Sequence, residues 1–277
     1  MKVETDEFVD VVVEYRGPVA TVRIRPNFRH DTDTAAGTFV HWELGETFSR
    51  LRGDNDVRVV VLTGAQDGAF QVPPRTDVIG SDAGHDARVD PVWTWRVFTG
   101  TIRLLETMVQ MEKPIVARVN GDAIGFGQSI MFACDLIYAR EDARIADMHM
   151  GRGEVEPYGP PFCVVPGDGG AVFAPLQMAP ALAKEYLMLS TEYSARELAD
   201  RGILNAAVPL EELDAVVDRT VDRLLTRSAY ALAWTKRVAN KAVMQQLNLA
   251  VDAAAGYEAL NFYQGPHLDW KDPQTFV

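Results

Sequence analysis

The residues from Val119 onward form a turn that could bind an oxyanion. The run VNGDAIGFGQSIMFACDLIYA places a strand end, a glycine-rich turn and an apolar helix in direct succession. Backbone N–H groups in the first turn of a helix have no partner inside the helix, so they can bind negative charge. Such turns are common, and this one alone is a weak signal. A second segment, VVVLTGAQDGAF, strengthens it, because a strand that ends at Gly64 leads into another turn.

Hydrophobic periodicity predicts the elements that must position these turns. Alternation in VDVVVEYRGPVATVRIRP indicates two strands joined by a hairpin at Arg16-Gly17-Pro18. Short apolar runs predict buried strands at 57–64, from 114 and from 135, and helical spacing predicts helices over about 36–53 and 93–112. The chain is mostly helical from about 171 onward, including a capping box at Ser194 and Glu197, an amphipathic run LEELDAVVDRTVDRLL, and the stretch 229 to about 262. Strands alternating with helices predict an α/β fold.

Both turns, the hairpin start and the helical C-terminal third closely resemble the crotonase (enoyl-CoA hydratase/isomerase) superfamily over nearly the whole chain. This resemblance implies a ββα spiral core, which we place at residues 1–200, and a C-terminal helical trimerisation region at 201–277. It implies a homotrimer or hexamer. It also implies an oxyanion hole made by the backbone amides of Val72 and Phe126. Proline follows Val72 where the family usually has glycine, and Phe126 replaces a glycine, which a backbone donor tolerates.

The expected catalytic carboxylates of a hydratase are missing. Enoyl-CoA hydratases of this family use two glutamates to handle the water and the proton. By position, these would fall at Ser129 and His149, and neither residue is a carboxylate. The sequence therefore predicts that ordinary hydration chemistry lacks both of its acid–base groups.

Three other segments resemble the 6-oxocamphor hydrolase-like β-diketone hydrolases of the same superfamily. The VPGDG run contains Asp168, HWELGETFSRLRGDNDVRVVVLTG contains His41, and YEAL contains Glu258. The resemblance implies that His41 and Glu258 orient a water and that Asp168 delivers a proton. His149 is the candidate partner of Asp168, in a loop that is longer here. Burial of Asp168 would raise its pKa and keep it protonated as an acid.

Each of these residues also has a structural interpretation. Asp168 could be a turn residue or the N-cap of the following helix. His41 could be a half-buried helix histidine, His149 a core histidine and Glu258 a solvated charge. The basic run TKRVANK, from Thr235, is similar to a helix that often serves CoA phosphates, but it does not decide the substrate. Trp93 and Trp95 are expected in the core or in a pocket wall.

The amino-acid composition limits the classes of partner that we expect. The 277 residues carry a net charge of −12 and no basic stripe, so we expect no nucleic-acid partner and no anionic membrane. Cys134 and Cys163 lack metal-binding spacing, and we expect no metal and no cofactor. The N-terminal MKVETDEFVD lacks the apolar segment of a signal peptide, and a cytoplasmic location follows as the expectation.

Three functions remain open from the sequence. The leading one is an enzyme that stabilises an enolate during hydrolytic C–C cleavage (retro-Claisen) of a β-diketone, a small-molecule substrate. The second is a hydratase, isomerase or hydrolase acting on an acyl-CoA thioester, with CoA as part of the substrate. The third is a catalytically silent scaffold or binding protein of the crotonase fold. Two irregular segments rich in proline and glycine, at about 71–91 and 150–170, are expected to serve function.

Overall fold

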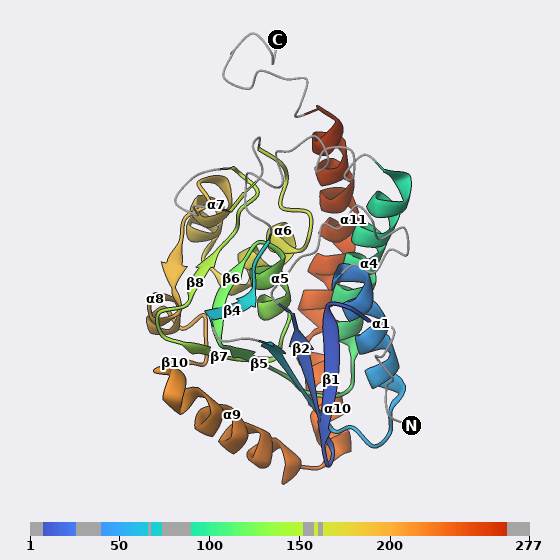
Figure 1. Cartoon of the computed structure of the whole chain (residues 1–277), viewed down its shortest axis with the longest axis vertical. Coiled ribbons are helices and arrows are strands. Elements are labelled where there is room, and N and C mark those ends of the chain that lie inside the picture. The colour runs from blue at the N-terminus through green and yellow to red at the C-terminus, as the bar shows by residue number, and fades with distance from the viewer. Residues whose placement is uncertain are drawn as a thin grey trace.

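The computed structural model describes residues 8–25, 40–65, 68–73, 90–151, 158–159 and 163–264. Its strands form two sheets, and helices cover them (Figure 1). The larger sheet contains β1 (Val11–Arg16), β2 (Val19–Ile24), β3 (Val59–Gly64), β5 (Ile115–Val119), β7 (Leu136–Arg140) and β10 (Ala206–Val208) in that order. The smaller sheet contains β4 (Gly68–Gln71), β6 (Gly121–Ile124), β8 (Arg144–Ala146) and β9 (Tyr193–Ser194). The helices are α1 (Val40–Gly53), α4 (Pro91–Gln110), α5 (Phe126–Phe132), α6 (Gly170–Gln177), α7 (Pro180–Met188), α8 (Ala195–Asp200), α9 (Leu210–Leu225), α10 (Ala229–Ala239) and α11 (Lys241–Gln264).

Strand order confirms the predicted ββα spiral. Three consecutive pairs, β3–β4, β5–β6 and β7–β8, each place one strand in the larger sheet and the next strand in the smaller one. Within each sheet these strands pair in parallel, whereas the predicted hairpin of β1 and β2 is antiparallel. Each turn of the spiral therefore ends in the smaller sheet.

Close backbone approach makes glycine necessary where the chain passes from one sheet to the other. A Cβ on Gly121 would lie 2.0 Å from the carbonyl carbon of Gly68, and a Cβ on Gly64 would lie 2.0 Å from the carbonyl oxygen of Ala69. The Asn120 side chain fixes the same corner, because its Oδ1 accepts a hydrogen bond from the Gly64 amide at 2.9 Å. These contacts set the exit directions of β4 and β6, and thus of the two turns predicted to bind an oxyanion.

The main core joins the spiral to the C-terminal helices. All six residues of β3 are buried, as its uninterrupted apolar run predicts. Leu247 and Val251 of α11 belong to the same buried cluster as Leu44 of α1 and Leu105 of α4. In Figure 1, α11 runs beside α4 along one side of the sheets. The boundary at residue 200 stays a prediction, and the C-terminal helix completes the core of the spiral.

Several predicted elements are confirmed, with one difference. Ser194 and Glu197 form the predicted capping box at the start of α8. Cys134 is a buried free thiol. The stretch predicted as helical from 229 to 262 consists of two helices, because α10 ends at Asn240, whose amide bonds to the Lys236 carbonyl, and α11 begins at Lys241. Most of the first irregular segment and much of the second lie outside the described residues.

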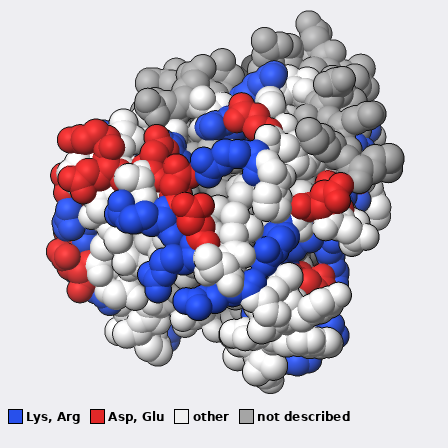
Figure 2. Space-filling view, turned by 90° about the horizontal axis from the view of Figure 1, so that it is seen from below, with Lys and Arg blue, Asp and Glu red and all other residues white. Residues whose placement is uncertain are grey.

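Charges of both signs mix on the face that carries α9. Figure 2, the view from below, shows Lys and Arg interspersed with Asp and Glu on this face. Ion pairs such as Arg118–Asp214 at 2.6 Å and Arg16–Asp218 at 2.7 Å link α9 to the larger sheet. None of the helices in the described part of the chain has the length and apolar character needed to cross a bilayer.

We expect the chain to form a trimer or hexamer through the exposed face of α10. Tyr230, Trp234 and Val238 lie four residues apart on one side of this helix and are 81%, 62% and 70% exposed. An exposed apolar face of this kind is typical of a subunit interface, and a charge placed in it would weaken association. Trp234→Glu should therefore reduce the particle mass measured by light scattering at micromolar concentration. Trp95→Glu, at a residue that is 65% exposed on α4, is the control and should leave the mass unchanged. A monomeric parent protein would refute the expectation.

Candidate active site

Three of the predicted catalytic residues meet in one buried cluster. His149 follows β8, Asp168 precedes α6, and Glu258 lies on the inner face of α11. The His149 Nε2 atom is 3.5 Å from Asp168 Oδ2 and also 3.5 Å from Glu258 Oε1. All three side chains are buried. A single ring nitrogen thus lies at ion-pair distance from two carboxyl groups.

Three further residues, which the sequence analysis did not select, complete the cluster. Asp147 Oδ1 lies 2.9 Å from His149 Nδ1 and also accepts a hydrogen bond from the His149 amide at 2.9 Å. Ser129 Oγ donates to Asp168 Oδ1 at 2.9 Å. Gln128 Nε2 lies 2.9 Å from Ser129 Oγ and 3.4 Å from Asp147 Oδ2. The sequence held one clue to Asp147, an acidic residue two positions before His149 at the end of a strand.

The cluster shifts the pKa of each of its acids and bases. The pKa of Asp168 is raised to about 7, mainly by burial; the charge of His149 and the Ser129 hydrogen bond oppose the rise, and the Glu258 and Asp147 charges add to it. Burial also raises the pKa of Glu258, against the hydrogen bond and charge of His149. Burial alone lowers the pKa of His149, but the Asp147 and Asp168 charges and hydrogen bonds with Asp147 and Glu258 raise it well above its ordinary value. At neutral pH the site thus holds an imidazolium beside a carboxyl group that can still carry a proton.

These positions exclude one structural interpretation of Asp168 and one of Glu258. The N-cap of α6 is Gly169, and no side chain caps that helix end, so the N-cap interpretation of Asp168 is wrong. Glu258 is only 6% exposed, so it is not a solvated surface charge. Both carboxyl groups are directed to the buried imidazole, where an unpaired charge would be costly.

The two predicted oxyanion turns lie against each other. Val72 follows β4, and Phe126 is the first residue of α5. A Cβ on Gly127 would lie 2.1 Å from the Gln71 carbonyl oxygen, so the first turn of α5 packs directly on the end of β4. His41, in the first turn of α1, is buried, and its ring lies 4.1 Å from the Phe126 ring. The structure therefore places His41 beside the predicted oxyanion turn.

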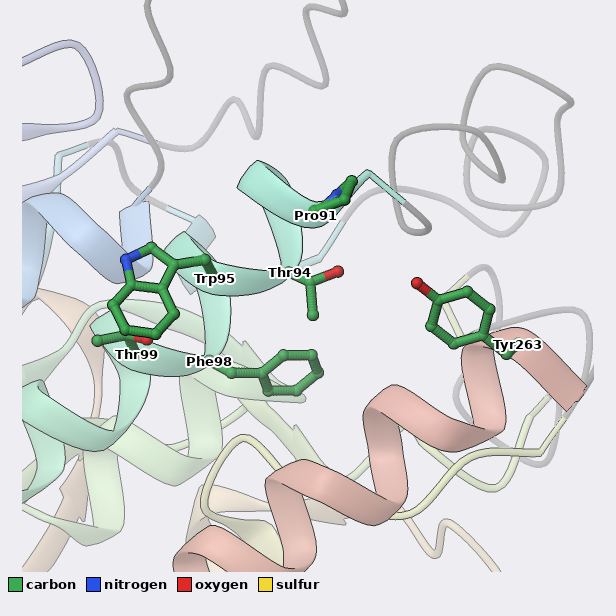
Figure 3. A pocket seen from close by; sticks show the side chains of 6 residues that line it. All are labelled: Pro91, Thr94, Trp95, Phe98, Thr99 and Tyr263. Carbon is green, nitrogen blue, oxygen red and sulfur yellow. The ribbon is translucent and has the colours of Figure 1, made fainter.

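An aromatic pocket opens between the start of α4 and the end of α11. It has a volume of about 360 Å³ and is lined by Pro91, Thr94, Trp95, Phe98, Thr99 and Tyr263 (Figure 3). Phe98 also belongs to a buried cluster with Val164 and Phe262. Phe262 lies one helical turn beyond Glu258 on the same face of α11. Buried apolar side chains thus pack along α11 between this pocket and Glu258.

The two tryptophans and one lysine of the basic run have contacts that show what each side chain packs against. Trp95 lines this pocket, whereas Trp93 packs edge-on against Phe262 at a ring distance of 6.1 Å. Lys236 of the basic run is buried, and its Nζ lies 2.7 Å from Asp135 Oδ2. This lysine therefore serves the core.

Asp147, His149 and Asp168 also have a spacing that could hold a metal ion, because one ligand atom from each lies within 4.8 Å of the others. However, Asp147 and Asp168 approach opposite nitrogens of the same imidazole. Each of these two carboxylates thus already pairs with a nitrogen of the imidazole. The arrangement fits an imidazolium between carboxylates better than a metal centre with all three as ligands.

Comparisons with known proteins agree with this architecture. The profile of the enoyl-CoA hydratase/isomerase family matches residues 34–269. A crotonyl-CoA hydratase from Syntrophomonas wolfei is 27% identical over 220 residues, covering 79% of this chain and 78% of the relative. A carnitinyl-CoA dehydratase from Proteus mirabilis is 27% identical over 196 residues, 71% and 68% of the two chains.

Solved structures of similar proteins share the fold of this chain. An enoyl-CoA hydratase/isomerase from Mycobacterium paratuberculosis superimposes with a TM-score of 0.73 at 26% identity, covering 91% of this chain and 93% of the other. A β-diketone hydrolase from Anabaena, bound to (S)-3-oxocyclohexyl acetic acid, superimposes with a TM-score of 0.76 at 19% identity, covering 93% and 96%. At that identity the second likeness shows the fold alone. The family profile spans most of the sequence, and the chain belongs to the enoyl-CoA hydratase/isomerase family, the crotonase superfamily.

Proposed function

We propose that this protein hydrolyses a C–C bond of a β-diketone by a retro-Claisen reaction. One observation supports this most directly: Asp168 and Glu258 lie 3.5 Å from the same nitrogen of His149. Hydrolytic C–C cleavage needs a group that takes a proton from water and a group that gives a proton to carbon. Two carboxyl groups joined by one imidazole match this need.

The proposed reaction begins with a water held by His41 and Glu258. Glu258 accepts a proton from the water while the water oxygen forms a bond to one carbonyl carbon. The bond between that carbon and the central carbon then breaks, and its electron pair forms an enolate with the second carbonyl. The amides of Val72 and Phe126 bind the enolate oxygen. Asp168 Oδ2 gives its proton to the central carbon, which yields a carboxylic acid and a ketone.

His149 returns the proton to its starting position in this scheme. Its Nε2 passes a proton from Glu258 to Asp168, so both carboxyl groups regain their initial state. The raised pKa of Asp168 suits a group that must be protonated before it acts on a carbanion. The β-diketone hydrolase from Anabaena, which shares the fold, is a precedent for such chemistry on this scaffold.

The competing function is turnover of an acyl-CoA thioester, as in the relatives named as hydratases and dehydratases. It is disfavoured by Ser129 and His149, which occupy the positions expected for the two hydratase glutamates. Both residues instead contact Asp168. A scaffold without activity has no need for a buried carboxyl group with a raised pKa.

We expect the protein to cleave cyclic 1,3-diketones and to hydrate crotonyl-CoA poorly. General acid–base groups each contribute about 10²–10⁴-fold, so hydration should be slower than in an ordinary hydratase by at least that factor. The measurement is turnover of a panel of cyclic 1,3-diketones and crotonyl-CoA, with products identified by mass spectrometry. Efficient hydration together with no diketone cleavage would contradict the proposal.

The activity should fall as the pH rises above about 7. Asp168 must be protonated to act as an acid, and its pKa is raised to about 7, so the active form is lost as pH increases through that value. We expect kcat/KM on the diketone to decrease about tenfold per pH unit on this limb. Asp168→Asn keeps the shape of the side chain and should lower kcat by about 10²-fold or more. It should also abolish the decrease in activity above pH 7, because asparagine does not titrate. Full turnover by Asp168→Asn would show that the residue is structural.

Gly127→Ala should damage the oxyanion hole. Its Cβ would collide with backbone at the end of β4, so α5 and β4 must separate, and the Val72 and Phe126 amides with them. Loss of one such donor costs about 10²–10³-fold in kcat, or about 2.7–4 kcal/mol. Gly256→Ala is the matched control, because a Cβ there meets nothing within 4 Å. Equal kcat values in steady-state assays of the two variants would argue against an oxyanion hole at this place.

A further inference from the structure

We propose that Asp147 is a positioning residue which, together with Gln128 and Ser129, keeps a hydrogen on His149 Nδ1 and leaves Nε2 to pass a proton between Glu258 and Asp168. This inference rests on the proposed function of the same site. Asp147 contacts the Nδ1 atom of His149, whereas Asp168 and Glu258 contact Nε2, and Asp147 therefore acts through His149.

The contacts form a closed ring of five side chains. Asp147 Oδ1 lies 2.9 Å from His149 Nδ1, and the other ring nitrogen of His149, Nε2, lies 3.5 Å from Asp168 Oδ2. Ser129 Oγ donates to Asp168 Oδ1 at 2.9 Å and accepts from Gln128 Nε2 at 2.9 Å. Gln128 Nε2 closes the ring by donating to Asp147 Oδ2 at 3.4 Å. Every member is buried. A ring of this kind restricts each member to a few combinations of donor and acceptor.

The direction of the hydrogen bonds determines where a mobile proton can be. Gln128 Nε2 donates to both Ser129 Oγ and Asp147 Oδ2, and the Ser129 hydroxyl donates to Asp168 Oδ1 at 2.9 Å, a shorter distance than the 3.4 Å to its other acceptor, the Gly125 carbonyl oxygen. A proton on Asp168 must then be on Oδ2, the oxygen that faces His149.

At the opposite end of the hydrogen-bonded ring, Asp147 Oδ1 accepts a hydrogen bond from the His149 amide and also faces His149 Nδ1. When Nδ1 carries a hydrogen, it donates a second hydrogen bond to the same carboxylate oxygen. Only Nε2 is left to exchange a proton, and it faces both Asp168 and Glu258.

Two glycines after Asp168 make room for this ring. A Cβ on Gly170 would lie 2.4 Å from Asp147 Oδ2, and a Cβ on Gly169 would lie 3.0 Å from the Cβ of Ser129. Gly169 also has φ of 120°, in the region that favours glycine. The start of α6 therefore packs directly on the ring, which ties the position of Asp168 to those of Asp147 and Ser129.

The charge of Asp147 affects the imidazole as well as its orientation. The charged or titratable groups around His149 are Asp147 beside it, Asp168 before α6, Glu258 on α11, and Tyr186 on α7, which interacts with Asp147 and Asp168. The two aspartate charges and the bonds with Asp147 and Glu258 raise the pKa of His149. Removal of the Asp147 charge should therefore lower the pKa of the imidazole and shift the pH dependence of any reaction that uses it.

The test compares Asp147→Asn with a matched control, Tyr186→Phe. Asparagine keeps an oxygen for the His149 Nδ1–H and amide but removes the charge. Tyr186 is equally buried, and its hydroxyl has no hydrogen-bond partner within the described part of the chain, so Tyr186→Phe removes a buried polar group without removing a hydrogen bond of the ring. Ring ¹⁵N NMR of histidine-labelled full-length protein, from pH 6 to 9, reports protonation of each nitrogen. The His149 signals are assigned by their loss in His149→Gln.

In the parent protein and in Tyr186→Phe, we expect Nδ1 to stay protonated across this range. In Asp147→Asn, we expect the His149 pKa to fall by about one unit or more, a tenfold loss of proton affinity. On a diketone that the parent cleaves, kcat should fall about 10²-fold, and the pH–rate profile should move with the His149 titration. Ser129→Ala, a second variant on the opposite side of the ring, should raise the pKa of Asp168 and move the alkaline limb upward, because the Ser129 hydrogen bond lowers that pKa.

An unchanged His149 titration in folded Asp147→Asn would overturn the inference, and so would a shifted titration that the pH–rate profile does not follow. The NMR measurement uses no substrate, so the ring is tested even if no diketone is cleaved. Diketone cleavage with an unchanged His149 titration would reject the ring while leaving the proposed function intact.

Discussion

The structure of this site depends on one buried imidazole surrounded by three carboxyl groups. Burial of three carboxyl groups without a cation would be very costly, and most of them would have to be protonated. His149 reduces this cost because both of its nitrogens face carboxylates, Asp147 on one side and Asp168 with Glu258 on the other. The compensation is incomplete, since one imidazolium cannot neutralise three carboxylates. Burial is the main cause of the raised pKa of Asp168, and the neighbouring Glu258 and Asp147 charges add to it against the opposing charge of His149.

Successive turns of the ββα spiral each deliver one part of this site. The β3–β4 turn ends at Val72, the β5–β6 turn leads into Phe126, Gln128 and Ser129, and the β7–β8 turn ends at Asp147 and His149. Asp168 then enters before α6, and α11 returns across the site with Glu258. Glycines at the sheet corners permit the close backbone approach that brings these turns together. The α/β framework thus explains why Asp168 and Glu258, which are 90 positions apart in the sequence, share one imidazole nitrogen.

Membership of the enoyl-CoA hydratase/isomerase family shows the scaffold, while the side chains determine the chemistry. Ser129 and His149 at the expected glutamate positions need not mean a loss of activity, because each contacts the carboxyl group of Asp168. In the proposed function, the acid–base groups lie instead on the loop before α6 and on α11. The buried Lys236–Asp135 pair illustrates a related point, since a basic residue in a family-like motif can serve the core.

Sequence alone determined the alternating strands and helices, the glycine-rich turns after β3 and β5, and the absence of glutamate at two expected positions. These features are local, and hydrophobic period and residue type are enough to reveal them. It also selected Asp168, His149 and Glu258, but only through resemblance, and it left a helix cap and a solvated charge as alternatives. Tertiary structure rejected those alternatives, because burial and partners depend on segments far apart in the chain. The ring through Asp147, Gln128 and Ser129 was decided only in three dimensions, since hydrogen bonds between side chains require distances that no linear pattern contains.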